Sequence, residues 1–354
     1  MKKILSAILV IIMIMSVFCV NVSAEEAIEL TPEEKSEIKL RNADVDSNGT
    51  YSTEDVRLLL QAAAGTGEDK ASYDIDSDGC TSVEDALAVL REISNVESLL
   101  TDAEAVALMN AKLNNVKTRG TGLPGFEKTI TATCNSMKIT QTVTASNVFL
   151  QPMIKDMNCT DLEYDKYVEK MVDMMGSGKL TESEKQNIEA MKKSAKEYRL
   201  PQTEKVIAKP ENYVDHFLNF PRDTKNTSSE ITTADIASID YVMEAGNIKF
   251  TLMMPSKRYT SFAAYATNTY AKIMNVVEFD NDDGTRLNSV TLNNGSVVMK
   301  FNAQTGAMVS ADYSYSYVSD VSAPTQTQSN ESMGSITVDM KTKTSATITE
   351  KVVF

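Results

Sequence analysis

The length of 354 residues predicts two or three folded units. The chain has 49 Asp and Glu against 35 Lys and Arg, a net charge of −14 that argues against sequence-independent nucleic-acid binding. Its content of 42% hydrophobic residues excludes wholesale disorder. The absence of Trp argues against a cleft that stacks sugar rings on Trp, and the presence of one histidine, His216, argues against a hydrolase with a His base.

The first segment has the pattern of a secretory signal peptide. Two lysines at 2–3 precede an apolar run over residues 4–20, and small residues at 22–24 precede two glutamates. We expect cleavage after Ala24 and a secreted, extracellular protein. A membrane anchor is disfavoured because the run is short and a cleavage site follows at once. A lipoprotein at Cys19 is disfavoured because Phe18 occupies a position that needs a small residue. No other run reaches the ~18 apolar residues of a span.

The next segment contains an internal repeat of two acidic loops that lie 30 residues apart. Each loop has twelve residues, with oxygen-bearing side chains at the first, third, fifth, ninth and twelfth positions and glycine at the sixth. The seventh residue is expected to contribute its backbone carbonyl. The predicted metal ligands of the first loop are Asp44, Asp46, Asn48, Thr50, Ser52 and Asp55. Those of the second loop are Asp74, Asp76, Asp78, Cys80, Ser82 and Asp85.

This spacing suits Ca²⁺, a hard cation that takes roughly six to eight oxygen ligands. Alternate side chains of a tight loop converge on one ion, and glycine accepts the positive φ at the sharp reversal. Cys80 need not act as a thiol ligand, which a hard cation would not favour. The sequence therefore predicts two bound calcium ions. A turn that binds nothing is the alternative for a single loop, and repetition in the same register argues against it.

Each loop is followed by an amphipathic pattern that predicts a helix, over residues 53–64 and 83–94. The five residues before the first loop, 39–43, leave little room for an entering helix. The residues expected to share the apolar face are Val56, Leu59 and Leu60 in the first helix and Ala86, Val89 and Leu90 in the second.

The repeat, the Asp at each twelfth position and the loop–helix order resemble the type I dockerin module over residues 37–98. Dockerins attach exported proteins to cohesin domains on a scaffoldin in cellulosome-like complexes. The resemblance implies a small all-α unit with two calcium loop–helix (F-hand) motifs, held at the cell surface or in a complex through cohesin. Three positions depart from the family pattern, namely Tyr51, Gln61 and Thr81. The partner-binding residues that the resemblance implies are Thr53, Glu54, Val83, Glu84 and Arg91.

Beyond residue 100 the pattern alternates between helical and β segments. Helices are expected over 101–117, 161–175, 181–198 and 256–274. Strands are expected over 126–133, 137–144, 241–244, 248–253, 287–292, 296–302, 308–318 and 335–354. Turn residues at 135–136, 245–247, 293–295 and 304–306 predict hairpins, and the polar stretch 322–334 predicts a loop.

The predicted fold class is therefore multidomain: the small all-α dockerin unit, then an α+β domain with a curved antiparallel sheet. The predicted boundaries are a signal peptide at 1–24, an N-terminal segment at 25–36, the dockerin at 37–98 and a cargo domain at 101–354 that folds alone. Residues 295–317 weakly resemble a type of uncharacterised exported bacterial domain, and this resemblance brings no known activity.

Catalytic motifs are absent from residues 101–354, and we name no catalytic residue. His216 is expected on a helix face, and the tyrosines at 313, 315 and 317 are expected on a covered sheet face rather than on a ligand platform. Cys134 and Cys159 leave a disulfide and free thiols both open. The acidic residues expected in a solvated turn are Glu278, Asp280, Asp282 and Asp283.

We therefore expect an exported, calcium-dependent docking protein that carries a non-catalytic accessory domain, with a polysaccharide or a cell-surface component as its ligand. The alternative is a cohesin-docked carbohydrate-active hydrolase, similar to a glycoside hydrolase, whose active site no motif reveals. The missing Trp and the single His favour the accessory domain. The frequency of enzymes among dockerin-bearing proteins favours the hydrolase.

Overall fold

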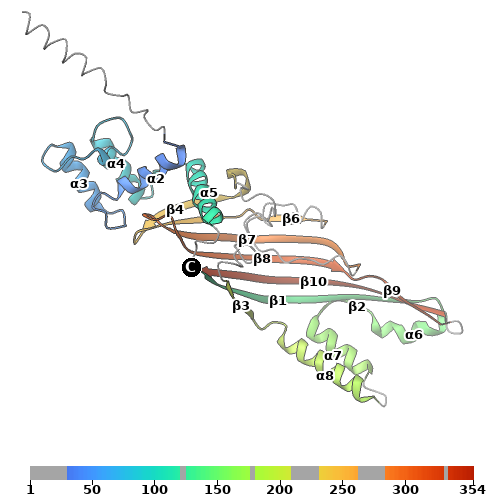
Figure 1. Ribbon diagram of the computed structural model, residues 1–354. Helices are drawn as coiled ribbons and strands as arrows, with labels where there is room; N and C mark the ends of the chain where they lie inside the picture. Colours follow the sequence, from blue (N-terminus) through green and yellow to red (C-terminus); the bar gives the residue numbers. More distant parts are fainter. Residues whose placement is uncertain (1–29, 120–124, 176–179, 209–230, 262–283, 331–333) are drawn as a thin grey trace, which may run out of the picture.

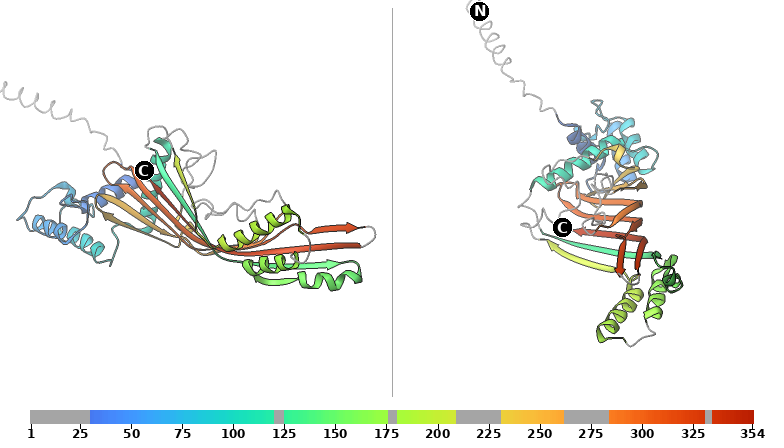
Figure 2. Two further views of the ribbon diagram at one scale, coloured as in Figure 1. Left: turned by 90° about the horizontal axis from the view of Figure 1, so that it is seen from below. Right: turned by 90° about the vertical axis from the view of Figure 1, so that its right-hand side faces the viewer.

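The structure is a computed structural model that describes residues 30–119, 125–175, 180–208, 231–261, 284–330 and 334–354 (Figure 1). Within these ranges a long antiparallel sheet forms the body of the molecule, and one group of helices packs at one of its ends (Figures 1 and 2). No helix in this part of the chain is long and apolar enough to cross a membrane. The signal segment, His216 and the acidic residues at 278–283 lie outside the described residues.

The described strands form a single ten-stranded sheet in the order β2-β1-β10-β8-β7-β5-β4, with antiparallel pairing throughout. Three further pairings lie off this path: β3 pairs with β1, β6 with β7 and β9 with β10. The strands are β1 (Phe126–Ala145), β2 (Cys159–Glu163), β3 (Gln202–Ala208), β4 (Ser238–Glu244), β5 (Asn247–Met253), β6 (Lys257–Tyr259), β7 (Arg286–Asn302), β8 (Met308–Ser322), β9 (Gln326–Asn330) and β10 (Gly334–Val353).

The helices form two groups. Those near the sheet edge at β4 are α2 (Pro32–Ala43), α3 (Thr53–Ala63), α4 (Val83–Ile93) and α5 (Asp102–Arg119). Those beside β1 and β2 are α6 (Gln151–Ile154), α7 (Tyr164–Met175) and α8 (Glu182–Glu197). Short 3₁₀ turns connect them, namely η1 (Ala71–Tyr73), η3 (Val148–Leu150), η4 (Lys155–Met157) and η6 (Thr233–Asp235).

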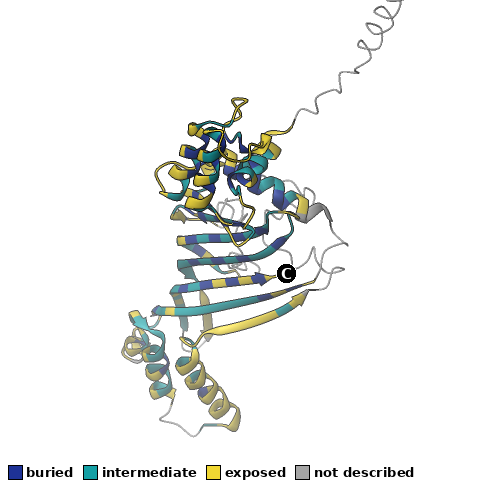
Figure 3. Ribbon diagram, turned by 90° about the vertical axis from the view of Figure 1, so that its left-hand side faces the viewer, coloured by how far each residue is buried: buried dark blue, intermediate teal, exposed yellow. Residues whose placement is uncertain are grey.

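Buried residues alternate with more exposed ones along β4, β5, β7 and β8, so one face of this part of the sheet is apolar and buried. Figure 3 shows this alternation as bands of colour along the strands. Along β5 every second side chain is buried, at Ile248, Phe250 and Leu252. The same alternation runs through β7 and β8, because successive side chains of a strand point to opposite faces. Phe250 and Phe301 meet edge to face across the β5–β7 pair, with their ring centroids 6.1 Å apart. This buried face is the base on which the N-terminal helices pack.

The predicted fold class is wrong, because the protein is not a small all-α unit followed by a separate α+β domain. All ten described strands belong to one large antiparallel sheet, which is the largest structural unit of the described chain. Leu40, Leu59 and Val89 of the N-terminal helices lie in the same buried cluster as Phe250 and Phe301 of the sheet. A helical unit of some sixty residues buries little apolar surface by itself, and the end of the sheet supplies the missing partner. The residue boundaries predicted for the domains stay predictions.

Two predicted hairpin turns are instead bulges inside continuous strands. β1 pairs with β10 on both sides of Asn135, and the register shifts between Cys134 and Ser136. β7 likewise pairs with β8 on both sides of Asn294, which has φ 54°. Asn, Ser and Gly suit a bulge as well as a turn, since a bulge also needs an unpaired residue. Pairing with one long partner strand, which sequence does not display, decides between the two.

Three other predicted elements differ from the structure. A capped helix, α2, precedes the first acidic loop, because Thr31 and Glu34 form a capping box and Pro32 opens the helix. The polar stretch 322–334 contains strand β9, which pairs with β10. The helix expected over 256–274 begins instead with strand β6, and its remainder from residue 262 lies outside the described residues.

Candidate metal sites in two acidic loops

The two acidic loops share one local construction, in which the ninth and twelfth positions cap the helix that follows. The Ser52 side chain accepts a hydrogen bond from the backbone N of Glu54, and the Asp55 side chain accepts one from the backbone N of Ser52 at 2.8 Å. Ser82 and Asp85 repeat this capping box at α4, with the corresponding bond at 2.6 Å. The capping holds each twelfth-position carboxylate in the first helical turn, beside its loop.

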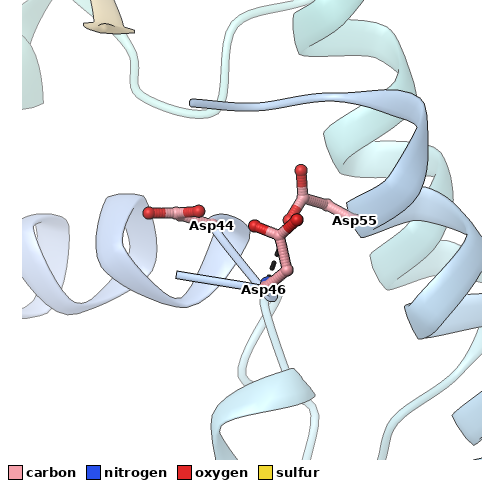
Figure 4. Close-up of side chains that lie close together, drawn as sticks. All are labelled: Asp44, Asp46 and Asp55. Carbon is pink, nitrogen blue, oxygen red and sulfur yellow. Dashed lines mark hydrogen bonds between the residues drawn. The ribbon is translucent and has the colours of Figure 1, made fainter. Parts of the chain in front are cut away.

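Three carboxylates of the first loop gather at one point (Figure 4). Asp44 stands at the end of α2, Asp46 follows in the loop, and Asp55 projects from the first turn of α3. One oxygen from each lies within 4.8 Å of the others. Asp55 is 0% exposed, and its Oδ1 accepts a hydrogen bond from the backbone N of Asp46 at 3.2 Å. This arrangement brings together three of the six ligands predicted for the loop.

A buried oxygen in this cluster provides a test of whether a cation fits. Asp44 Oδ2 accepts a hydrogen bond from the backbone N of Gly49 at 2.8 Å. Asp44 Oδ1 is buried and has no hydrogen-bond partner. Burial raises the pKa of Asp44, and the charges of Asp55 and Asp46 add to the rise. A buried carboxylate oxygen beside two further carboxylates is costly unless a cation offsets it, so this donor set fits a metal ion.

The second loop gathers the carboxylates of Asp74, Asp76 and Asp78 within 4.8 Å of one another. Burial raises the pKa of Asp76, and the charges of Asp85, Asp78 and Asp74 raise it further. Asp85 is 0% exposed and uses Oδ1 to accept hydrogen bonds from the backbone N of Ile75 and of Asp76, at 2.6 and 3.2 Å. The chain thus has two clusters of acidic residues that could bind a metal ion.

The other predicted ligands take part in bonds within their own loops. The Asn48 side-chain oxygen accepts from the backbone N of Thr50 at 2.9 Å, and its Nδ2 donates to Asp46 Oδ2 at 2.7 Å. Cys80 is exposed, and its Sγ donates to Asp78 Oδ1 at 3.2 Å. This hydrogen bond raises the pKa of the Cys80 thiol, which disfavours the thiolate that a soft metal would need.

The five residues predicted to contact a partner are all exposed. Sequence reasoning missed the apolar part of the same surface, because Leu60 and Leu90 were expected on the buried face of their helices. The structure leaves Leu60 43% exposed and Leu90 38% exposed. On α4 the exposed apolar side chains continue through Leu87 to Val83, at a spacing that keeps them on one face of the helix. Leu60 and Leu90 lie at the border of the apolar stripe of their helices. Helical periodicity in the sequence therefore does not tell whether such residues are buried or exposed.

Two further sequence predictions are decided by the sheet. Tyr313 and Tyr315 are buried on the covered face, so they form part of the core and not a ligand platform. Cys134 lies at the β1 bulge, whereas Cys159 is opposite Gln141, seven positions further along β1. That separation is about 23 Å at ~3.3 Å per residue, too far for a disulfide. Both cysteines are free.

Comparisons with protein-family models, with curated proteins and with solved structures gave no match for this chain.

Proposed function

We propose that this chain is an exported calcium-binding protein whose two loop–helix motifs dock, in the manner of a dockerin, onto a cohesin domain of a scaffoldin. The observation that carries the proposal is the repetition of one local structure. Residues 51–60 and 81–90 have the same burial class at every position, and both helices open with the same Ser–Asp capping box. A repeated, similarly exposed surface next to two acidic loops is suited to metal-dependent recognition of a partner.

The residues favour calcium over softer metals. Both clusters consist of carboxylates, the oxygen ligands that hard cations prefer. The neighbouring thiol of Cys80 is exposed, and its hydrogen bond to Asp78 raises its pKa. Asp44, Asp46 and Asp55 would hold one ion, and the second loop would hold the other. A bound calcium ion would supply the positive charge that offsets the repulsion among these carboxylates. The capped twelfth-position aspartates would then hold α3 and α4 against their loops.

The exposed surface beside the loops supports a protein partner. Val83 is 51% exposed, and Leu87 and Leu90 extend its apolar strip along α4. Glu84 and Arg91 border this strip and are also exposed. An apolar strip with charged residues at its border is the composition expected of a protein-binding surface.

Calorimetry of the purified chain with calcium tests the metal assignment. We expect about two equivalents to bind, one for each acidic cluster. Asp46→Asn and Asp76→Asn should each remove one equivalent, and the double variant should remove both. Cys80→Ser is the control and should bind as the unaltered chain does, because only the backbone carbonyl of that residue is expected to coordinate. Absence of calcium heat in the unaltered chain would contradict the proposal.

Capture on immobilised cohesin domains tests the partner. Capture should require calcium and should be lost in chelator, and Val83→Asp should weaken it about tenfold or more, as for a central apolar contact. Val96→Asp is the matched control, because Val96 is 74% exposed but lies beyond the end of α4. Capture that survives chelation would contradict calcium-dependent docking. Failure on every cohesin with normal calcium binding would contradict the cohesin assignment alone.

We propose that the sheet has an accessory, non-catalytic role. The two loop–helix motifs would attach it to a polysaccharide-degrading complex. The alternative, a carbohydrate-active hydrolase, uses the same dock. Release of reducing sugar from a panel of polysaccharides by the full chain would favour the hydrolase, whereas binding to the same panel without release would favour the accessory role.

A further inference from the structure

The first acidic loop is joined directly to the sheet. Gly49, at the sixth position of the loop, packs against Gly246 in the turn between β4 and β5. The Gly49 carbonyl accepts a hydrogen bond from the backbone N of Gly246 at 2.9 Å. The approach is so close that a Cβ on Gly49 would lie 2.3 Å from the Gly246 nitrogen. Only a glycine at this loop position allows the contact.

This contact is one step in a chain of hydrogen bonds from a metal ligand to the sheet. Asp44 Oδ2 accepts from the backbone N of Gly49, and the Gly49 carbonyl accepts from Gly246. The Gly246 carbonyl in turn accepts from the backbone N of Ala303, at the turn between β7 and β8, at 3.0 Å. A change in the position of Asp44 therefore reaches two hairpins through three consecutive bonds.

The second loop has the same internal bond but no contact with the sheet at the matching glycine. Asp74 Oδ2 accepts from the backbone N of Gly79 at 2.9 Å, as Asp44 does from Gly49. Gly79 is exposed, and no described atom would lie within 4 Å of a Cβ added to it. The hydrogen bond that joins α4 to the sheet is at Glu92, near the other end of that helix and about 14 Å along its axis from the helix start.

We propose that the two acidic loops differ in role: the first is a joint whose metal ion stabilises the β4–β5 hairpin, and the second acts on its own helix alone. This inference rests on the proposed calcium binding. An ion held by Asp44, Asp46 and Asp55 would fix the loop in the conformation that presents the Gly49 carbonyl to Gly246. Loss of that ion would free the loop and remove one support of the hairpin, whereas loss of the second ion would leave the hairpin supported.

Hydrogen exchange of the full chain, measured by mass spectrometry with calcium and with chelator, tests this difference. Calcium should slow exchange in peptides that cover residues 241–250 by about fivefold or more, the lower end of typical coupling between sites. Asp46→Asn should abolish this protection, and Asp76→Asn, the matched change in the second loop, should retain it. Both residues are exposed, so neither change disturbs packing against the sheet.

A second pair of variants tests the contact itself. Gly49→Ala should lose the calcium-dependent protection of the hairpin, because the added Cβ collides with Gly246. Gly79→Ala should keep it, although both glycines have a positive φ, 86° and 99°, and both changes strain their loops. Equal effects of the matched variants would overturn the inference. If calcium bound at both sites but did not slow hydrogen exchange at residues 241–250, only this inference would be overturned. Absence of calcium binding would overturn the proposed function as well.

Discussion

The partly buried carboxylate of Glu92 joins α4 to β4 at the edge of the sheet. Glu92 Oε2 accepts hydrogen bonds from the backbone N of Leu99 at 2.6 Å and from the hydroxyl of Tyr241 at 3.0 Å. The Tyr241 hydroxyl in turn accepts from the backbone N of Leu100 at 2.6 Å. Burial raises the pKa of Glu92, and these two hydrogen bonds only partly oppose the rise. Hydrogen bonds therefore fix Glu92 to Leu99 and to the sheet, but its ionised carboxylate is unfavourable at this partly buried position.

Replacing Glu92 with Gln should change how stability depends on pH. Because the folded-state pKa of Glu92 is raised, folding favours its protonated form, and that contribution is present below the ordinary value of 4.5 and lost as pH rises through the folded pKa. Gln keeps an acceptor oxygen and has no charge. The Glu92→Gln chain should therefore gain stability relative to the unaltered chain as pH rises from about 4 to 7.

The measurement is the urea midpoint of both chains in chelator across this pH range, which keeps calcium binding out of the comparison. Glu84→Gln is the control, because Glu84 lies on the same helix but is exposed. If the stability advantage of Glu92→Gln over the unaltered chain shrank with rising pH, the predicted direction would be wrong.

At the scale of elements, β1 and β10 are the longest pair, and a buried ion pair joins them. Lys128 Nζ lies 2.8 Å from Glu350 Oε1, and the two side chains are 7% and 3% exposed. Both project from the face of the sheet that is covered. A buried ion pair adds little net stability over apolar residues, but either charge alone is costly there. The pair therefore disfavours any shift of β1 along β10 that would separate the two charges.

Removing one partner should cost much more than removing both. Lys128→Met should lower the free energy of unfolding by about 3–5 kcal/mol, because Glu350 is left buried and unpaired. The double change Lys128→Met with Glu350→Leu should restore most of this loss. Lys138→Met is the control in the same strand, since its pair with Glu163 is 3.8 Å long and partly exposed, and should cost less than about 1 kcal/mol. Urea unfolding of the unaltered chain, Lys128→Met, Glu350→Leu and the double variant gives the cycle. Additive losses would contradict the prediction.

At the scale of the whole molecule, the continuous core predicts cooperative unfolding. Helices α2, α3 and α4 contribute to the same buried cluster as the sheet. Hydrogen bonds also join this region to the sheet, from Gly246 to Gly49 and from Tyr241 to Glu92. Calorimetric melting of the full chain in calcium should therefore give one transition. Chelation should move this single transition to lower temperature, because calcium binds the folded state preferentially. Two separate transitions, of which only one responds to calcium, would instead support independent units.

Local patterns in the sequence determined the acidic loops, the helices that follow them and the carboxylates that gather in them. These features depend on residues within about twelve positions of one another, such as Ser52 with Asp55, so their chemistry is visible in a short stretch of sequence. Only the tertiary structure decided that the turn-like residues around Asn135 and Asn294 are bulges. It also decided which acidic loop meets the sheet. Contacts such as that between Thr50 and Ala245 join residues 195 positions apart, and a local pattern carries no record of them.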